Sequence, residues 1–315
     1  MKVLVTGGAG FIGSNLLSAL RVSTQEDILV VDNLEDGAKF SNIVDIPISD
    51  YMDQDEFLRK VQTDKQFLSK VKCVFHQGAC SNTTEWDGKY MMKNNFTYSK
   101  ILLEACLEKN IQFIYASSAA VYGSSLNFTE DIKNEAPLNV YGYSKLLFDQ
   151  YVRNIKLNNK QQIVGLRYFN VYGPKEQHKG NMASVAYHFN QQIINQGTAS
   201  LFRGSHGYDD GEQKRDFIYV KDVCKVNLWF LQQPHVSGIY NLGTGRPNTF
   251  NAMAEAIIAW HGKGTINYID FPETLREAYQ SFTSADLKQL RKTGCDIDFL
   301  DIKEGINQYL TQLSE

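Results

Sequence analysis

A glycine motif between a strand and a helix constrains this chain of 315 residues more than any other feature. Gly8-x-Gly10-x-x-Gly13 directly follows the β-branched run Lys2–Gly7 and opens the amphipathic pattern Ser14–Leu20. Glycine permits the tight turn, the close approach of a phosphate group and the contact between helix and strand. The N–H groups at the helix N-terminus then favour an anion. This context predicts a loop that binds the pyrophosphate of a dinucleotide, rather than a turn that binds nothing.

Buried β-branched runs alternate with helical patterns through the first half of the chain. The predicted strands are Lys2–Gly7, Asp27–Asn33, Cys73–Ala79, Phe113–Ser118 and Ile163–Phe169. The predicted helices are Ser14–Leu20, Asp53–Val61, Asn94–Glu108 and Tyr143–Ile155. This alternation predicts an α/β fold with a doubly wound parallel sheet of the Rossmann type, and ligands at the carboxyl ends of the strands.

The pattern changes after Phe169 and predicts a smaller α/β carboxyl-terminal lobe that binds substrate. Its predicted helices and strands are Met182–Asn195, Phe250–Trp260 and Ile302–Leu313, and Ser200–Arg203 and Asn267–Phe271. A helix at Val220–Gln232 and a parallel strand at Gly238–Gly243 are expected to return to the main sheet. We therefore assign residues 1–170 plus about 217–247 to the dinucleotide-binding domain, and about 171–216 plus 248–315 to the substrate lobe. The polar stretch His206–Lys214 is expected to be a mobile loop.

Composition excludes several classes of function. The net charge is −3, so no basic field points to nucleic acid or to an anionic membrane. No apolar run approaches the roughly 18 residues that a membrane span needs. The first strand begins almost at the initiator methionine, which leaves no room for a cleaved signal. The five cysteines are scattered without the spacing of metal ligands. We expect a cytoplasmic protein with reduced thiols and no metal site.

The residues after the second predicted strand bear on the type of dinucleotide. Asp32 ends that strand, where an acidic residue usually binds the adenosine ribose. A carboxylate repels a 2′-phosphate, so Asp32 alone favours NAD. Asn33 and Lys39 follow closely, and an ammonium there could neutralise the additional phosphate of NADP. These residues alone leave both cofactors open.

Tyr141 and Lys145 are four positions apart, so a helix places both on one face. The ordinary pKa of a phenol is about 10, and a nearby ammonium favours the ionised form. We therefore expect Lys145 and the positively charged nicotinamide ring together to lower the pKa of Tyr141 toward the range where the phenol acts as a general base near neutral pH. Ser118, at the end of the fourth predicted strand, would orient the substrate oxygen. Tyr-x-x-x-Lys also occurs by chance, but this context indicates an enzyme that removes a hydride and a proton from a carbinol.

Three motifs together resemble the extended short-chain dehydrogenase/reductases that act on nucleotide sugars: Thr6–Gly13, Ser118–Gly123 and Tyr141–Lys145. The resemblance covers essentially the whole chain. Four further blocks resemble the branch that epimerises ADP-heptose for the lipopolysaccharide inner core: His76–Ser81, Thr84–Met92, Arg167–Pro174 and His178–Ser184.

The resemblance implies tightly bound NADP and a self-contained redox cycle. A hydride leaves C6″ of the heptose, which gives a transient 6″-ketone, and returns to the opposite face. Because the oxygen lies in different places before and after inversion, the family uses two bases. Its second base is a lysine in the loop after the fifth strand, and the matching residue is Lys179. Tyr141 and Lys179 would alternate as acid and base while Lys145 positions the cofactor. The resemblance also implies a homo-oligomer, specifically a homopentamer.

The same resemblance implies which residues line the site. Those expected at the cofactor are Gly7, Gly10, Phe11, Ile12, Gly13, Asp32, Asn33, Lys39, Gln77, Gly78, Ala79, Cys80, Ser81, Asn94, Lys145, Val171 and Lys179. Those expected at the substrate are Asn170, Asn181, His188, Phe202, Arg203, Gly204, Ser205, Arg215 and Tyr279. The guanidinium of Arg215 suits the ADP diphosphate, although a surface ion pair is the plainer alternative. His188 could equally be structural.

Three positions depart from the family's pattern and bear on affinity and cofactor preference. Gln77 replaces an acid, Gln54 replaces a basic contact to adenosine, and Asn181 replaces a serine. The alternatives within the family are a UDP-hexose 4-epimerase and a 4,6-dehydratase. Elimination usually needs an Asp-Glu pair after the serine, where this chain has Ala119-Ala120. The alternative from another class is a non-catalytic dinucleotide sensor, although such proteins tend to lose the tyrosine or the lysine.

Overall fold

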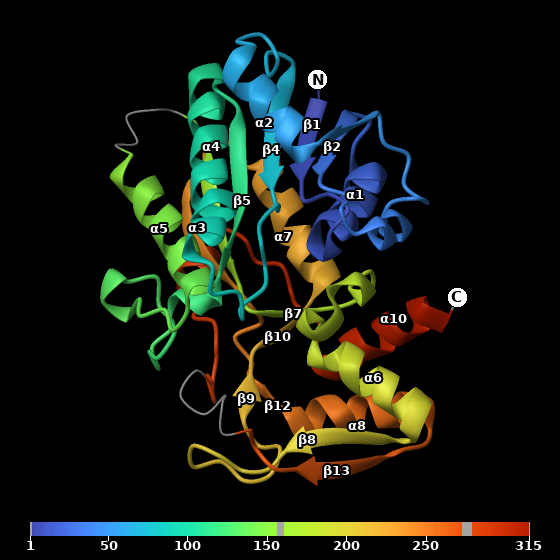
Figure 1. Ribbon diagram of the computed structural model, residues 1–315. Coiled ribbons are helices and arrows are strands. Elements are labelled where there is room, and N and C mark those ends of the chain that lie inside the picture. The colour runs from blue at the N-terminus through green and yellow to red at the C-terminus, as the bar shows by residue number, and fades with distance from the viewer. Residues whose placement is uncertain (1, 156–160, 273–278, 315) are drawn as a thin grey trace.

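Seven parallel strands form the central sheet of the computed structural model, which describes residues 2–155, 161–272 and 279–314 (Figure 1). The strand order is β11-β6-β5-β4-β1-β2-β3, and every neighbouring pair is parallel. The bounds are β1 (Lys2–Thr6), β2 (Asp27–Asp32), β3 (Asp50–Asp53), β4 (Val71–His76), β5 (Gln112–Ser118), β6 (Ile163–Tyr168) and β11 (Gly238–Leu242). The predicted doubly wound parallel sheet is confirmed.

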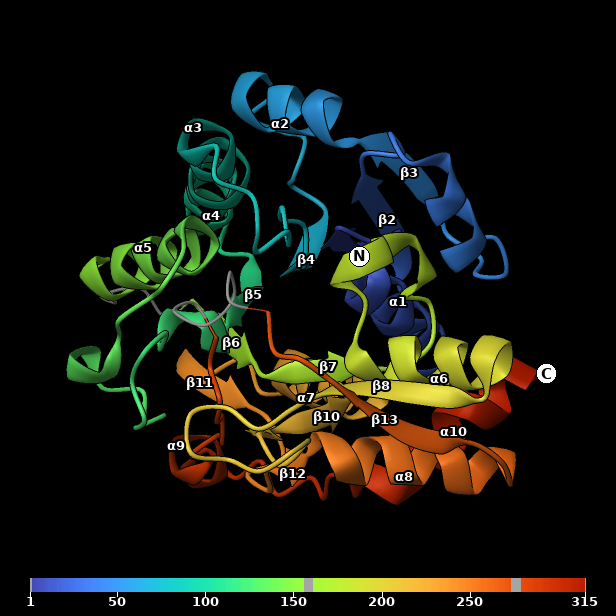
Figure 2. The ribbon, with the colours of Figure 1, turned by 60° about the horizontal axis from the view of Figure 1, so that its bottom comes forward.

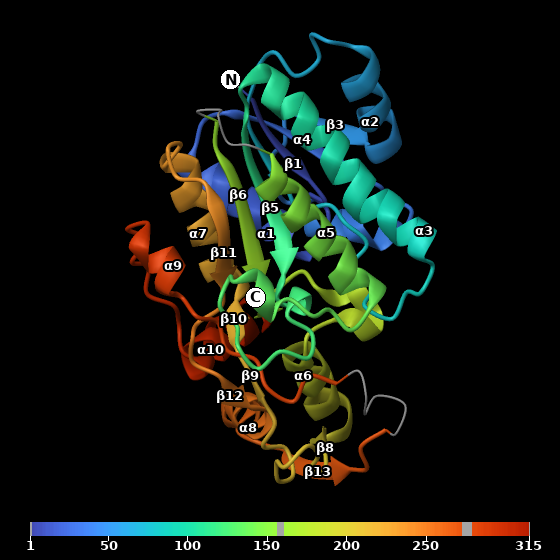
Figure 3. The same cartoon turned by 90° about the vertical axis from the view of Figure 1, so that its left-hand side faces the viewer.

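Helices cover both faces of this sheet, which explains why its strands read as continuous apolar runs. In β1, for example, Val3, Leu4 and Val5 are all 0% exposed. Figure 3 shows the helices separated into two layers, one on either side of the sheet. One face packs against α1 (Phe11–Ser23) and α7 (Val220–Gln232), and the other packs against α2 (Gln54–Thr63), α4 (Tyr98–Lys109) and α5 (Val140–Asn154).

Two local features differ from the sequence prediction. The edge strand β3 is not predicted, because its residues Asp-Tyr-Met-Asp are mostly polar and only Met52 is buried. Asp53, expected to begin a helix, instead caps α2 by accepting hydrogen bonds from the backbone N–H groups of Asp55 and Glu56. The single helix predicted at Asn94–Glu108 is preceded by α3 (Gly88–Met91) and by a π-helical stretch, Met92–Thr97, before α4 begins.

The second half of the chain builds a group of elements beyond the carboxyl ends of the sheet (Figure 1). It contains the parallel pair β8 (Thr198–Phe202) and β13 (Thr265–Ile269), with the helices α6 (Val185–Gln196), α8 (Phe250–His261) and α10 (Ile302–Ser314). These three helices share an apolar cluster that includes Phe189, Ile257 and Ile306. Smaller elements are β7 (Asn170–Tyr172), β9 (Lys214–Arg215), β10 (Phe217–Tyr219), β12 (Asn248–Thr249) and α9 (Lys288–Lys292).

The proposed domain boundaries stay a prediction. Within the described ranges, no helix combines the length and the apolar character that crossing a membrane requires.

A buried ion network holds β6 against α5. Arg167 is 0% exposed, and its Nε donates to Asp149 Oδ2 at 2.9 Å. The same guanidinium pairs with Glu135 and donates to the hydroxyl of Tyr122 at 3.0 Å. Arg153 also pairs with Glu135, at 2.6 Å, but its side chain is 23% exposed. Arg167 is therefore the cation that compensates the buried carboxylate of Asp149.

We expect Arg167→Met to reduce the free energy of unfolding by about 3–5 kcal/mol, because it leaves a buried carboxylate without its partner. Arg153→Met is the matched control and should cost about 1 kcal/mol or less, because Glu135 keeps Arg167 and the lost pair is partly exposed. Urea unfolding followed by circular dichroism measures both. Equal losses in the two variants would contradict this account of the network.

Candidate active site

A cleft of about 1080 Å³ lies at the carboxyl edge of the sheet, where the strand order reverses at β1. Such a switch point is where doubly wound proteins bind ligands. Its walls come from the loop between β1 and α1, the ends of β4 and β5, and the start of α5. The opposite wall comes from β7, β9 and the start of α6, which lie beyond the strand ends in Figure 2.

The glycine loop between β1 and α1 is too tight for side chains. Gly7 has a φ of +65°, and a Cβ there would lie 2.6 Å from the backbone nitrogen of Gly78. A Cβ on Gly13 would lie 2.0 Å from the carbonyl oxygen of Gly7. The N-cap of α1 is Gly10, so no side chain caps the helix. The loop therefore offers unobstructed N–H groups at a helix N-terminus, which fits a pyrophosphate.

Asp32 connects this loop to the expected adenosine end of the cleft. Its carboxylate is only 5% exposed and accepts a hydrogen bond from the N–H of Ala9 at 2.8 Å. Lys39 Nζ lies 2.6 Å from Asp32 Oδ1 and also donates to Asn33 Oδ1 at 2.9 Å. The ammonium thus balances the carboxylate and lies beside it in the cleft. His178, which the sequence analysis missed, also lines this end.

Gln77 presents a hydrogen-bond donor that the protein leaves unused. The amide of Asn227 donates to the carbonyl of Val223 at 2.9 Å and to the hydroxyl of Tyr168 at 3.0 Å. Tyr168 in turn donates to Gln77 Oε1 at 3.0 Å. The buried Nε2 of Gln77 has no partner among the described residues. Because unpaired buried donors are costly, this amide fits a site that a ligand completes.

The start of α5 brings Tyr141 to the end of β5. Asn139 caps the helix by accepting from the N–H of Gly142 at 2.8 Å. A Cβ at Gly142 would lie 2.7 Å from the carbonyl oxygen of Ala120, so the helix packs tightly against the segment that follows Ser118. The hydroxyl of Ser118 therefore lies close enough to the Tyr141 phenol to favour its ionised form. Ser118 and Tyr141 both line the cleft, as predicted.

The protein's own groups do not lower the pKa of Tyr141, and the expected joint effect of Lys145 and the nicotinamide ring stays a prediction. Burial raises the pKa of Tyr141 above its ordinary value, and the neighbouring hydroxyl of Ser118 opposes this only in part. Lys145 is 7% exposed, and its Nζ donates to the carbonyl of Ala116 at 2.9 Å. Burial lowers the pKa of Lys145 to about 8. The lysine lines the cleft with Tyr141, but its charge is directed to a backbone carbonyl.

Lys179 enters the same cleft from the helical turn Gln177–Met182, which lies between β7 and α6. Its Nζ lies 5.5 Å from the centre of the Phe11 ring, at the start of α1. Burial lowers the pKa of this lysine, and the negative charge of Glu176 partly opposes the shift. An amine with a lowered pKa can exchange protons closer to neutral pH than an ordinary lysine.

Arg215 is a buried cation with no carboxylate partner among the described residues. It is 7% exposed and lies against Tyr279 at 4.7 Å and Phe250 at 5.6 Å from the ring centres. Its guanidinium donates to the carbonyl of Lys214 at 3.2 Å. A desolvated guanidinium in this state suits an anionic ligand.

Comparison with known proteins shows the family. A family model described as the NAD dependent epimerase/dehydratase family matches residues 3–243. The chain belongs to this family. An ADP-L-glycero-D-manno-heptose-6-epimerase of Alkalilimnicola ehrlichii is 56% identical over 313 residues, which cover 99% of this chain and 98% of that protein.

Solved structures agree with this assignment. The Helicobacter pylori ADP-L-glycero-D-manno-heptose-6-epimerase is 31% identical, with a TM-score of 0.86 over 99% of this chain and 96% of that one. A UDP-glucose 4-epimerase of Thermus thermophilus, solved with NAD, is 27% identical, with a TM-score of 0.78 over 100% and 99% of the two chains.

Most residues expected at the cofactor and substrate of this epimerase/dehydratase line the one cleft, but four do not. His188 lies on α6 with its ring 5.7 Å from that of Tyr187. Arg203 pairs with Asp270 at 3.2 Å, Gly204 donates to Asp210 at 2.7 Å, and Ser205 accepts from Gln213 at 3.1 Å. The roles of these four residues at the substrate stay predictions.

The cleft also contains residues that the sequence analysis did not name. Gln280 follows Tyr279 and donates to the carbonyl of Gly123 at 2.6 Å, which ties this wall to the segment after β5. Tyr90, Phe217 and Thr283 are further examples. Each lies in a loop or at the end of an element, where periodicity gives no signal.

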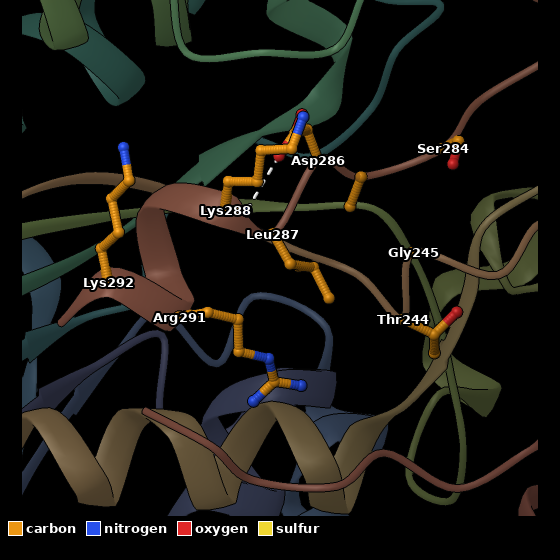
Figure 4. Close-up of a pocket in the computed structure, with 9 residues that line it drawn as sticks. Thr244, Gly245, Ser284, Asp286, Leu287, Lys288, Arg291 and Lys292 are labelled. Carbon is orange, nitrogen blue, oxygen red and sulfur yellow. Dashed lines mark hydrogen bonds and ion pairs between the residues drawn. The ribbon is translucent and has the colours of Figure 1, made fainter. Parts of the chain in front are cut away.

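A second hollow of about 860 Å³ lies at α9, apart from these residues (Figure 4). Two of its three cations already have partners in the protein. Lys288 pairs with Asp286 at 3.4 Å, and Arg291 donates to the carbonyl of Cys295 at 2.8 Å while lying over the Phe299 ring. None of the predicted site residues lines it, so the chemistry of this family member belongs to the larger cleft.

We expect Gly13→Ala to abolish dinucleotide binding, because the added methyl would overlap the carbonyl of Gly7 and force the loop open. Gly37→Ala is the matched control, since a Cβ there meets nothing within 4 Å. Fluorescence titration with NADP(H) and NAD(H) measures both variants. Full affinity in Gly13→Ala would rule out this loop as the pyrophosphate site.

Proposed function

We propose that this protein inverts C6″ of ADP-D-glycero-D-manno-heptose to give ADP-L-glycero-D-manno-heptose, the heptose donor for the lipopolysaccharide inner core. The observation that carries the proposal is the presence of two proton-transfer groups, Tyr141 and Lys179, from separate elements of one cleft. The 56% identity to a heptose 6-epimerase supports the choice of sugar. An isomerase activity of this kind needs both groups.

A nicotinamide dinucleotide bound in this cleft would supply reversible hydride transfer at the substrate carbon. The residues that would hold it are the glycine loop, Asp32, Lys39, the segment Gln77–Ser81 and Lys145. The glycine loop binds the pyrophosphate through its N–H groups. The free amide of Gln77 and the ammonium of Lys145 supply further donors to an acceptor in the cleft.

Proton transfer is divided between the two walls. Tyr141, beside the hydroxyl of Ser118, receives or donates the proton of the C6″ oxygen in one orientation. Inversion moves that oxygen to the other side of the carbon. Lys179 then accepts or donates the proton on that side. Burial lowers the pKa of Lys179, which makes proton exchange easier near neutral pH. Each residue acts as a base in one direction of the reaction and as an acid in the other.

The substrate diphosphate is assigned to Arg215. Its buried guanidinium has no carboxylate partner among the described residues, and Tyr279 and Phe250 hold its plane. Asn170, Asn181 and Phe202 also line the cleft and supply amides and an apolar surface for the sugar. In this proposal, His188 and the segment Arg203–Ser205 contact only the part of the substrate that extends beyond the cleft.

We favour NADP over NAD as the cofactor. Lys39 neutralises Asp32 at 2.6 Å, so the carboxylate repels a 2′-phosphate less than it would alone. His178 lines the same end and can offer a ring N–H as a hydrogen-bond donor. Family resemblance further supports a cytoplasmic homopentamer.

The decisive experiment is incubation of the purified protein with ADP-D-glycero-D-manno-heptose, followed by NMR of the C6″ configuration. A substrate deuterated at C6″ should keep its label through inversion. Tyr141→Phe and Lys179→Met should each lower kcat by about 10²–10⁴-fold, as expected for loss of a general acid–base. Tyr143→Phe, an exposed tyrosine on the same helix, is the matched control and should retain full activity.

Four outcomes would contradict the proposal. Turnover of UDP-hexoses in place of ADP-heptose would indicate a 4-epimerase, and release of water from the sugar would indicate a dehydratase. Dinucleotide binding without turnover of any nucleotide sugar would indicate a sensor. Full activity in Tyr141→Phe would remove the proposed chemistry altogether.

We expect Lys39→Met to weaken NADP binding by about 10-fold or more, since a hydrogen bond to a charged group contributes roughly 1.5–3 kcal/mol. NAD affinity should change little, because NAD has no 2′-phosphate. Lys72→Met, which removes a lysine paired with Glu26 at 3.6 Å, is the control. Parallel titrations with NADP and NAD measure the ratio, and an equal loss for both would favour a role for Lys39 in folding of the loop.

A further inference from the structure

The loop between β7 and α6 carries Lys179, and the buried carboxylate of Glu176 accepts hydrogen bonds from both ends of this loop. This side chain is 0% exposed. Its Oε1 accepts hydrogen bonds from Ser184 Oγ at 2.8 Å, the N–H of Gly173 at 3.3 Å and the hydroxyl of Tyr309 at 3.3 Å. Its Oε2 accepts from the N–H of Ser184 at 2.6 Å. Four donors surround the group, which suits an ionised carboxylate.

These contacts join three parts of the fold. Gly173 and Ser184 are the two ends of the loop between β7 and α6, and Tyr309 lies on α10. Ser184 is also the cap of α6, because its Oγ accepts from the N–H of Tyr187 at 3.2 Å. The loop between these ends contains Lys179. The hydrogen bonds to Glu176 therefore hold the two ends of this loop in place.

Glu176 also acts on Lys179 directly. The N–H of Lys179 donates to the carbonyl of Glu176 at 3.0 Å, so the two residues are held on one turn. No described carboxylate forms an ion pair with Lys179 Nζ, which lies 5.5 Å from the centre of the Phe11 ring. Glu176 thus supplies the negative charge that favours the ammonium form against burial.

Other charges near the loop act on a different residue. Lys39, Asp32 and Asp36 influence His178, whose pKa is lowered by burial and by the neighbouring lysines. His178 hydrogen-bonds with Asn42 at 3.0 Å. Among the described groups, Glu176 is the one whose charge raises the pKa of Lys179.

We propose that Glu176 is a positioning residue for Lys179, because its carboxylate holds both ends of the loop that carries the lysine. The inference rests on the proposed role of Lys179 as second acid–base. Tyr309 supplies only one of the four donors to this carboxylate.

The test compares Glu176→Gln, which removes the charge at nearly constant size, with Tyr309→Phe, which removes one donor and keeps the charge. The pKa of Lys179 is measured in the full-length protein from the pH dependence of its acetylation, with peptide mass spectrometry. Glu176→Gln should lower that pKa, because an anion that favoured the ammonium is lost. Tyr309→Phe should leave it within a few tenths of the original value.

Kinetics provide the second measurement. Glu176→Gln should reduce kcat by about 10²-fold, as expected for a displaced reacting group, with a smaller change in KM and a shifted pH profile. Tyr309→Phe should stay within about threefold of the parent, consistent with the loss of one modest hydrogen bond. An unchanged Lys179 pKa in Glu176→Gln, or equal losses in the two variants, would overturn the proposal.

If Glu176→Gln fails to fold, Glu176→Asp carries the test, because it keeps the charge but withdraws the carboxylate from Ser184. It should lower kcat while leaving the pKa of Lys179 nearly unchanged, and full activity would overturn the positioning role. Acetylation does not depend on turnover. A parent protein that fails to convert ADP-heptose would therefore refute the proposed function separately from the inference about Glu176.

Discussion

The close contact of two backbone segments at the reversal point of the sheet is the constraint on which the site depends. Gly7 after β1 and Gly78 after β4 approach so closely that a Cβ on either would meet the other's backbone, at 2.6 and 3.1 Å. Thr6 fixes the contact, because its hydroxyl accepts from the N–H of Gly78 at 3.1 Å and hydrogen-bonds with His76 at 2.7 Å. The cleft exists because these two strand ends carry no side chains between them.

The elements that the sequence predicted well are those whose burial is uniform. The strands from β1 to β6, except β3, read as β-branched runs because helices cover both faces of the sheet. The helix at Val220–Gln232 was predicted to the residue, since its apolar stripe packs against β5 and α1. Where burial is partial the pattern fails. β3 contributes one buried residue, and the π-helical stretch before α4 has no distinct periodicity in the sequence.

The sequence predicts which residues line the site, but it does not predict where their charges are directed. Motifs placed Tyr141, Lys145 and Ser118 together, because spacing on a helix and position after a strand are properties of the chain. The direction of the Lys145 ammonium is a tertiary property, since it depends on the carbonyl of Ala116 on β5. Glu176 shows the same limit. Its four donors come from Gly173, Ser184 and Tyr309, the last of which is far away in the sequence.

The two kinds of chemistry in the cleft have opposite requirements, and the fold separates them. Hydride exchange needs rigid placement of a cofactor, which the backbone at the sheet edge supplies without relying on flexible side chains. Inversion needs proton donors on two faces of one carbon, which a single helix cannot provide. Tyr141 is set by the packed start of α5, whereas Lys179 lies on a loop that depends on Glu176 for its shape. Relatives with 27–31% identity share the fold and differ in sugar. Since fold alone does not determine function, we propose that the loop between β7 and α6, which carries Lys179, is the part of this protein that specifies the second half of the reaction.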